Sequence, residues 1–453
     1  MKLTRRKIIL GFGSTLAIIG AENSFRKVRA QSPSAEKKLQ HKSIKKIDFL
    51  ANGDIDKEAI YNEFLKAANN GKEDKPALLY KGIETSPYQD EIKYYSSRLK
   101  EKPDGTKLVS GIQADNSFSP YPSIGKLPKI DDKGLDFIHK DIKEACICIG
   151  SFAQRDFKTK WLGRRALKTQ EFWSGTKLIP LLNFVYLLNQ KTPGTNLDFY
   201  NIRGLDKEGK EINIPFYNLA RDIISYEENV ATSNSLGAMF KRFIPQLKLE
   251  KWVKSITGND DLVFRGRYGE KPFIDQPEVV HIRTKEILLN ADKEPPEWAC
   301  NEISAYDLTR MISMMGWHNY IPEESRLPGV KWRGIKTVIR AMGTDPARLT
   351  DLAIEILGLE KDIDSVVILS KLGNGSTGLR ERTEAVYVAL VQFIDRSPQE
   401  SGKPGKLTTL SMALRGGIAL EPRDFDREVI ELDARMATEV TDLIWRAVNG
   451  KLA

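Results

Sequence analysis

Strand-like segments lie near both ends of the chain, and this placement constrains the fold more than any other feature. Residues 145–152 (ACICIGSF) alternate between two faces, and residues 158–167 follow as a hairpin partner. Three successive antiparallel strands are predicted over residues 363–370, 384–394 and 406–414. Because helical patterns fill the sequence between these groups, we expect an α+β fold in which one antiparallel sheet joins both ends of the domain and packs against a helical lobe.

A very apolar helix is predicted directly after Ser174. Between residues 178 and 188, apolar side chains fall on nearly every side of the helix, which is typical of a helix buried in the middle of a domain. Another helix is predicted from Asp424, a good N-cap residue, to Asn449, with Gly450 as its stop. The sequence therefore predicts one helix inside the lobe and one that closes the domain.

The composition indicates a globular chain without a nucleic-acid partner. The 453 residues are 41% hydrophobic and 29% charged, which is ordinary for a chain that can bury a large core. The net charge is +9, but residues 1–30 hold seven Lys or Arg and one Glu, so they carry +6 and leave +3 for the remainder. A domain that binds phosphate backbones should stay strongly positive without its leader, so we exclude nucleic acid.

The cysteines and histidines are too few and too scattered for a disulfide framework or a zinc hydrolase. Cys146 and Cys148 share one face of a predicted strand, where we expect them to be small core residues. The full set comprises Cys146, Cys148, Cys300, His41, His139, His281 and His318.

The first 30 residues resemble an export signal. A basic start precedes the apolar run Ile8–Ala21, which is too short to span a bilayer comfortably. Residues 4–10 (TRRKIIL) resemble the twin-arginine signal, although an ordinary secretory signal also fits, and Ala30 ends a passable cleavage site. We therefore expect the protein in the periplasm or another extracytoplasmic compartment, with a membrane anchor only if the signal stays uncleaved.

Residues 31–130 differ from the rest of the chain. They begin Lys-rich, contain one helical pattern over residues 55–68 and end in polar turns. No catalytic motif stands out there, so we expect a linker or a small accessory segment. The predicted organisation is an export signal over 1–30, an extension over 31–130 and the main domain over 131–453.

Three short motifs in a fixed order offer the groups for a serine acyl-transfer site without histidine. The first holds a hydroxyl and an amine, the second a hydroxyl and a carboxamide, and the third an amine before a glycine-rich turn. They are Ser174-Gly175-Thr176-Lys177, Thr232-Ser233-Asn234 and Lys371-Leu372-Gly373.

A serine hydroxyl needs a base before it can attack a carbonyl carbon. Lys177 lies one helical turn from Ser174, and its pKa should fall if it is desolvated and close to Lys371. Thr232 would then relay the proton to the leaving group, and Asn234 would hold the substrate amide. Lys371 would also attract a substrate carboxylate.

The oxyanion hole would be formed by two backbone N–H groups, those of Ser174 and Asn374, with Gly373 beside them. Each motif is weak alone, because a helix-capping serine and a surface lysine have the same spacing. Only the motif at Ser174 precedes a buried apolar helix, although Ser-x-x-Lys occurs six times. These motifs start at Ser24, Ser34, Ser43, Ser97, Ser123 and Ser174.

In combination, these segments resemble the class A β-lactamase and penicillin-binding-protein family of serine hydrolases. Residues 172–180 (FWSGTKLIP) resemble its active-site serine segment, residues 232–236 (TSNSL) its Ser-Asp-Asn element, and residues 371–375 (KLGNG) its Lys-Thr-Gly strand. The resemblance covers residues 131–453. It implies α/β/α layers, with a five-stranded antiparallel sheet, flanking terminal helices and a separate all-helical lobe.

The resemblance also implies a serine acyl-enzyme that acts on a β-lactam or a D-alanyl-peptide-like amide, with no metal or organic cofactor. Several residues depart from the family pattern. Thr232 replaces a serine, and Leu372 replaces a hydroxyl residue that helps to bind the substrate carboxylate. For the glutamate that drives deacylation, the sequence offers only Glu297, four residues before Asn301. A second hypothesis is therefore a weak or inactive protein that binds cell-wall peptide or a protein partner.

Overall fold

A computed structural model describes residues 50–51, 54–69, 83–153, 156–293, 297–377 and 381–452. The predicted export signal lies outside the described residues, as does the Lys-rich start of the extension. Within the described ranges, no helix has the length and apolar character needed to cross a membrane.

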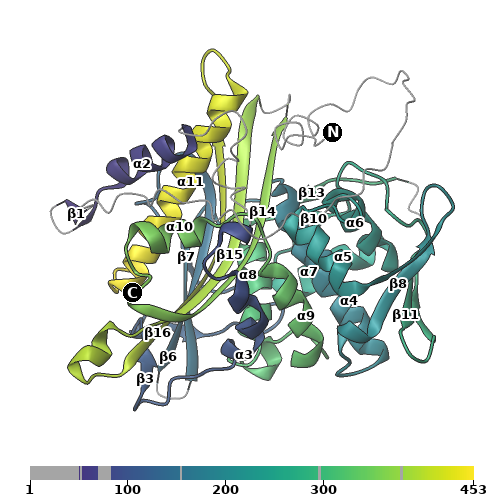
Figure 1. Ribbon diagram of the computed structural model, residues 1–453, viewed down its shortest axis with the longest axis horizontal. Helices are drawn as coiled ribbons and strands as arrows, with labels where there is room; N and C mark the ends of the chain where they lie inside the picture. The colour runs from purple at the N-terminus through teal and green to yellow at the C-terminus, as the bar shows by residue number, and fades with distance from the viewer. Residues whose placement is uncertain are drawn as a thin grey trace, which may run out of the picture.

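A large sheet forms the centre of the main domain (Figure 1). Its five long strands are antiparallel to their neighbours and lie in the order β14-β15-β16-β6-β7. Strand β6 pairs with β16, so that Cys146 lies opposite Ala413. This pairing confirms the prediction that one antiparallel sheet joins both ends of the domain. The long strands are β6 (Ile142–Ala153), β7 (Asp156–Arg164), β14 (Ile363–Thr377), β15 (Arg382–Asp395) and β16 (Gly405–Ile418).

The prediction of five strands is wrong, because the sheet has eight among the described residues. Strand β3 (Leu108–Ser110) pairs in parallel with the start of β16. Strands β4 (Ser119–Pro120) and β5 (Ile130–Asp131) both pair with β7. Strands of two or three residues are too short for a detectable alternation, so no sequence pattern indicates that residues 108–131 extend this sheet.

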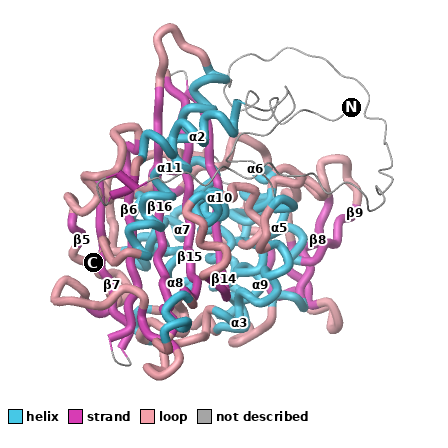
Figure 2. The backbone as a smooth tube through the Cα atoms, turned by 60° about the vertical axis from the view of Figure 1, so that its left-hand side comes forward, coloured by secondary structure: helices cyan, strands magenta, loops and turns pink. Residues whose placement is uncertain are grey.

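The two faces of the sheet carry separate hydrophobic cores. Because side chains alternate along a strand, Cys146 and Cys148 contribute to one core and Ile147 to the other. Both cysteines are buried free thiols, as predicted. Helix α8 packs on the first face, and α11 covers the second, with α10 and α2 against it (Figure 2). These helices are α2 (Lys57–Asn69), α8 (Ala305–Gly316), α10 (Leu349–Ile356) and α11 (Phe425–Val448).

The first and last of these helices lie close to their predicted ranges. The side chain of Asp424 caps α11, where it accepts a hydrogen bond of 3.0 Å from the Arg427 N–H. Helix α2 is joined to α11 by an ion pair of 2.5 Å between Lys57 Nζ and the buried Glu439 carboxylate. The N-terminal segment is therefore fixed to the helix that closes the domain.

The lobe beside the sheet is not all-helical, in contrast to the expectation. A four-stranded antiparallel sheet in the order β12-β11-β8-β9 lies at its outer side, on the right of Figure 1. The longest of these strands has six residues, which is too short for the alternation to outweigh the surrounding helical patterns. The strands are β8 (Tyr200–Leu205), β9 (Glu211–Pro215), β11 (Glu278–His281) and β12 (Ile287–Asn290), and a separate pair is β10 (Val263–Phe264) with β13 (Asn301–Glu302).

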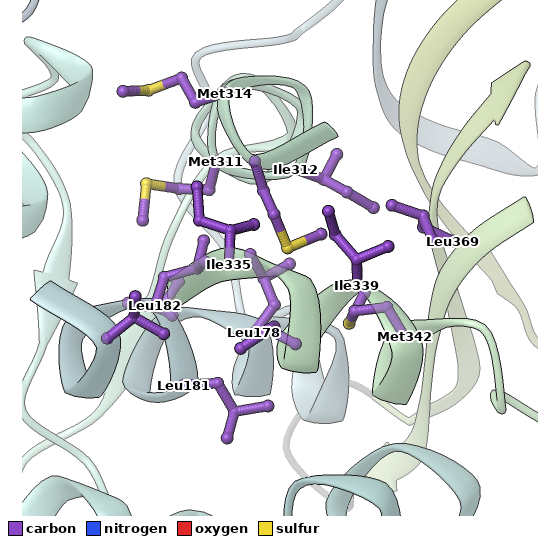
Figure 3. Packing of buried hydrophobic residues seen from close by; sticks show 14 of the residues in the cluster. Leu178, Leu181, Leu182, Met311, Ile312, Met314, Ile335, Ile339, Met342 and Leu369 are labelled. Atoms are coloured by element: carbon purple, nitrogen blue, oxygen red, sulfur yellow. The ribbon is translucent and has the colours of Figure 1, made fainter. Parts of the chain in front are cut away.

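Helix α4 (Leu178–Lys191) is buried in the lobe, as its apolar pattern predicted. It begins after a 3-10 helix, η4 (Trp173–Lys177), rather than at Ser174. Figure 3 shows its side chains packed against helices α8 and α9 (Trp332–Met342), with Leu369 of β14 nearby. The labelled side chains are Leu178, Leu181, Leu182, Met311, Ile312, Met314, Ile335, Ile339, Met342 and Leu369.

The remaining described elements are short or lie between those above. The α-helices are α3 (Tyr95–Arg98), α5 (Phe216–Ser225), α6 (Ser233–Phe240) and α7 (Gln246–Thr257). The 3-10 helices are η2 (Ile83–Thr85), η3 (Gln89–Tyr94), η5 (Leu197–Phe199), η6 (Lys241–Phe243), η7 (Glu323–Ser325) and η8 (Ser397–Ser401). Strands β1 (Leu50–Ala51) and β2 (Asp54–Ile55) form a small pair.

Candidate active site

Ser174 and Lys177 lie on the same side of η4. In a 3-10 helix the side chains of residues i and i+3 eclipse each other, so these two side chains project together. Ser174 is half-buried, whereas the Lys177 side chain is fully buried. The preceding residue, Trp173, has a φ of 45°, which is a strained value for a bulky residue. Such strained backbone conformations are frequent next to functional side chains.

Lys177 is held by the first turn of α6. Its Nζ donates hydrogen bonds of 2.9 Å to Ser233 Oγ and 2.6 Å to Asn234 Oδ1. Burial, reinforced by the positive charge of Lys371, holds the pKa of Lys177 well below its ordinary range. Lys177 is thus in direct contact with Asn234, and Ser174 lies three residues before it on η4.

Thr232 does not hold the place that the sequence predicted for it. Its hydroxyl caps α6, where it accepts a 3.1 Å hydrogen bond from the Ser235 N–H, and it donates to the Glu270 carboxylate. The hydroxyl against Lys177 belongs instead to Ser233, which also donates a 2.6 Å hydrogen bond to the Ile223 carbonyl. The reason is local, because the residue at the N-cap uses its hydroxyl for the orphan N–H groups of the helix.

Lys371 lies on β14, fully buried beside the same group of residues. Its Nζ donates a 3.3 Å hydrogen bond to the Ile224 carbonyl and lies 4.0 Å from Asp345 Oδ1. Burial lowers the pKa of Lys371 to about 7, and the Asp345 carboxylate opposes this shift. The positive charge of Lys371 contributes to the lowered pKa of Lys177, and the Tyr226 ring lies near both amines.

Strand β14 passes very close to the backbone of η4. A Cβ atom on Gly373 would lie 2.7 Å from the Gly175 nitrogen and 3.0 Å from the Ser174 nitrogen. Only glycine allows this approach. The half-buried Asn374 follows directly on the strand, so the backbone segments predicted to form the oxyanion hole are adjacent.

Leu372 points away from these residues. Its side chain is fully buried in the core beneath α11, on the sheet face opposite to Lys371. Its backbone N–H donates a 3.2 Å hydrogen bond to Asp345 Oδ1. A hydroxyl at this position would therefore lie in the core and not beside a substrate.

Two tyrosines enclose the lysines. The ring centroid of Tyr226 lies 3.5 Å from Lys371 Nζ and 5.5 Å from Lys177 Nζ, and its hydroxyl donates a 2.8 Å hydrogen bond to the Leu372 carbonyl. The ring of Tyr268 lies 5.1 Å from Lys177 Nζ. These rings exclude water from the two amines, which is the physical basis of their lowered pKa values.

The carboxylate nearest to this group of residues is not Glu297. The Glu297 side chain is exposed, and the charges that shift the pKa of Lys177 are those of Lys371, Glu270 and Glu228. Asn301 is occupied elsewhere, because its Oδ1 accepts hydrogen bonds from Lys241 Nζ at 2.8 Å and from the Gly266 N–H at 3.0 Å. Glu270 acts electrostatically on Lys177 and accepts the hydrogen bond from Thr232.

Several residues of this site could not be found from sequence motifs. Ser233 is the exception, because it lies inside the second motif and its hydroxyl could have been proposed as the one that contacts Lys177. The others arrive through tertiary packing: Tyr226 ends α5, Asp345 follows α9, and Tyr268 and Glu270 lie in the glycine-flanked stretch GRYGE. Among the described residues, no group of three or more His, Cys, Asp or Glu side chains could hold a metal ion.

Comparison with known proteins gives distant similarities in structure. A β-lactamase from Desulfarculus baarsii is 13% identical, with a TM-score of 0.35 over 67% of this chain and 93% of its own. A peptidoglycan synthetase from Bifidobacterium adolescentis is 10% identical, with a TM-score of 0.31 over 70% of this chain and 58% of its own. No protein-family model and no curated protein matches the sequence. Because these values are low, neither activity is transferred to this chain.

Proposed function

We propose that this protein is a serine hydrolase that cleaves an amide or ester through an acyl-enzyme on Ser174. The observation that supports this most is the buried Lys177, which projects from the same side of η4 as Ser174 and has a strongly lowered pKa. A lysine that only filled a surface position would keep its charge and face solvent. The predicted export signal would place the reaction outside the cytoplasm.

Acylation begins with transfer of the Ser174 proton to the neutral Lys177 amine. The Ser174 oxygen attacks the carbonyl carbon, and the oxyanion of the tetrahedral intermediate is stabilised by the backbone N–H groups of Ser174 and Asn374. Ser233 accepts a hydrogen bond from Lys177. It gives its hydroxyl proton to the leaving group as the bond to the carbonyl carbon breaks, and it takes the proton held by Lys177 in return. Lys177 is neutral again at the end of this step.

Deacylation needs a base for water, and Glu270 is the better candidate than Glu297. Glu270 takes a proton from water, and the oxygen of that water attacks the acyl carbonyl. As the bond from the carbonyl carbon to Ser174 breaks, Glu270 gives the proton back and the Ser174 oxygen leaves as the hydroxyl. Its carboxylate lies near Lys177 and beside the cap of α6, whereas Glu297 is exposed.

Hydrolysis of three compounds tests this proposal: 4-nitrophenyl acetate, a fluorescent penicillin and a D-alanyl-D-alanine peptide. We expect turnover of at least one, reduced about 10³-fold or more by Ser174→Ala. Ser123→Ala is the matched control, because Ser123 and Lys126 have the same spacing elsewhere in the chain. Turnover that survives Ser174→Ala, or that is absent for every compound, would contradict the proposal.

The alternative is a binding protein without turnover. The observation in its favour is that Lys371, which the sequence assigns to a substrate carboxylate, is fully buried against Asp345. This alternative predicts that a peptide binds with equal affinity to wild-type protein and Ser174→Ala, and that neither forms a covalent adduct.

A further inference from the structure

We propose that the substrate of this site has no carboxylate beside its scissile bond, and that Tyr226 is the residue that sets this preference. The inference rests on the proposed function, since it concerns the substrate class of the same serine. It separates this protein from the β-lactams and D-alanyl peptides that the sequence resemblance implies, because both carry a carboxylate next to the reacting amide. The class that remains is an ester or amide that is uncharged on its leaving-group side.

The first observation is that the side chain of Lys371 is closed to any incoming anion. It has no exposed surface, and the Tyr226 ring lies over its ammonium group, 3.5 Å from Nζ to the ring centroid. The Tyr226 hydroxyl fixes the ring in place through its 2.8 Å hydrogen bond to the Leu372 carbonyl. A substrate carboxylate would have to displace this ring before it could reach the lysine.

The second observation is that the charge of Lys371 already has a partner. The Asp345 carboxylate, also fully buried, lies 4.0 Å from Lys371 Nζ. It is held by 2.8 Å and 3.2 Å hydrogen bonds from the Ser370 hydroxyl and the Leu372 N–H. An arriving carboxylate would gain little from a lysine whose charge is offset by an internal, hydrogen-bonded carboxylate.

The third observation is the negative charge of two carboxylates that act on Lys177. Glu228 and Glu270 both act electrostatically on Lys177, and burial together with the Glu270 charge raises the pKa of Glu228. A substrate anion would be repelled by these groups. In the family that the sequence resembles, a hydroxyl residue binds such an anion, but here that position holds Leu372, whose side chain faces the opposite core.

A matched pair of chromogenic esters tests the preference: 4-nitrophenyl acetate and 3-carboxy-4-nitrophenyl acetate. They deliver the same acetyl group and differ by one carboxylate on the leaving group. Each kcat/KM is corrected for the rate of Ser174→Ala and divided by the spontaneous hydrolysis rate of that ester. We expect wild-type protein to prefer the uncharged ester by about tenfold or more, and equal rates or the reverse preference would overturn the inference.

Two variants of Tyr226 test the residue itself. Tyr226→Leu removes the ring from Lys371 and should reduce the preference for the uncharged ester, by improving KM for the carboxylate ester. Tyr226→Phe keeps the ring and should keep the preference. An unchanged ratio in Tyr226→Leu, in protein whose unfolding midpoint shows that it is folded, would overturn the role of Tyr226. If neither ester shows Ser174-dependent turnover but the fluorescent penicillin or the D-alanyl-D-alanine peptide does, the inference fails and the proposed function stands. If none of these compounds is turned over, both fail. A reversed ester preference overturns the inference and leaves the proposed function intact.

Discussion

At the scale of single residues, the site depends on which hydroxyl faces Lys177. Ser233 accepts the 2.9 Å hydrogen bond from Lys177 Nζ, while Thr232 caps α6. We therefore expect Ser233→Ala to lower kcat/KM by about 10²-fold or more, as for loss of a proton-transfer group. Thr232→Val should instead lower the free energy of unfolding by about 1 kcal/mol through loss of the cap. Steady-state kinetics and urea unfolding of both variants check this, and a larger kinetic loss in Thr232→Val would favour the relay expected from sequence.

Glu270 should control the pH dependence of acylation. Its carboxylate stabilises the protonated form of Lys177 and so opposes the lowering of that pKa. In Glu270→Gln this opposition is lost, the pKa of Lys177 falls further, and the rising limb of kcat/KM against pH moves to lower pH. Glu297→Gln is the control and should leave the limb unchanged. A shift to higher pH in Glu270→Gln, or the same shift in both variants, would show that the electrostatic assignment is wrong.

The sequence predicted part of this arrangement for a clear physical reason. Ser174, Lys177, Asn234 and Lys371 stand in short motifs, where chemistry and local geometry are encoded together. Tyr226 and Glu270 reach the site through packing between distant segments, for which no local pattern exists. The proton relay was predicted at Thr232, but the hydroxyl of this residue is engaged in capping α6.

At the scale of secondary-structure elements, the contact between β14 and η4 is the most restrictive. A methyl group on Gly373 would meet the Gly175 nitrogen at 2.7 Å, so the Gly373→Ala variant must move one backbone away from the other. We expect kcat/KM to fall by about 10²-fold, as for a displacement of roughly 1 Å in an active site. Gly417→Ala on β16 is the control, since its Cβ would meet only side-chain atoms at 3.4 Å. Equal kinetic effects of the two substitutions would contradict this account.

Most long elements were predictable from the sequence. The strand over 145–152 and the helix that ends near Asn449 appear with small shifts at their ends, because a buried face imposes a period of two or 3.6 on many residues. The strand predicted over 363–370 continues as β14 to Thr377, so the glycine-rich segment expected to turn after Lys371 is part of the strand. The buried helix was predicted to begin directly after Ser174, but α4 begins at Leu178 because the 3-10 helix η4 precedes it. The short strands of the lobe were missed because four to six residues do not establish a period.

At the scale of the whole molecule, a buried ionic network ties the central sheet to the site. Arg415 on β16 donates hydrogen bonds of 2.6 Å to Glu144 on β6 and 2.5 Å to Glu384 on β15. Glu384 in turn accepts a 3.0 Å hydrogen bond from Trp173 Nε1, directly before Ser174. All three charged side chains are at most 2% exposed, so the network joins three strands and the start of η4 within the core.

Removal of the central cation should destabilise the protein strongly. Arg415→Met removes the cation that bridges two buried carboxylates, Glu144 and Glu384, which also contact the more exposed Arg165 and Arg382. We therefore expect the free energy of unfolding to fall by about 3 kcal/mol. Arg427→Met removes an exposed pair with Glu431 and should change stability by less than about 1 kcal/mol. Urea unfolding of both variants checks the difference. Similar values for the two would mean that the buried network contributes little.

The whole-molecule arrangement was only partly accessible from sequence. Strands at both ends indicated a shared sheet, and β6 does pair with β16. The contribution of β3, β4 and β5 was not foreseen, because pairing of such short segments depends on where the long strands leave their edges open. The four-stranded sheet in the lobe was not predicted for the same reason, because the pairing of its short strands also depends on tertiary packing.

The central claim is that a neutral, buried Lys177 activates Ser174, and covalent labelling with a fluorophosphonate measures this directly. Peptide mapping by mass spectrometry, with the labelling rate followed between about pH 6 and pH 10, reports both the site of attack and the state of its base. We expect a single adduct on Ser174 that already forms at neutral pH and is lost in Lys177→Met. An adduct on another residue, or labelling of Ser174 at an unchanged rate in Lys177→Met, would contradict the account.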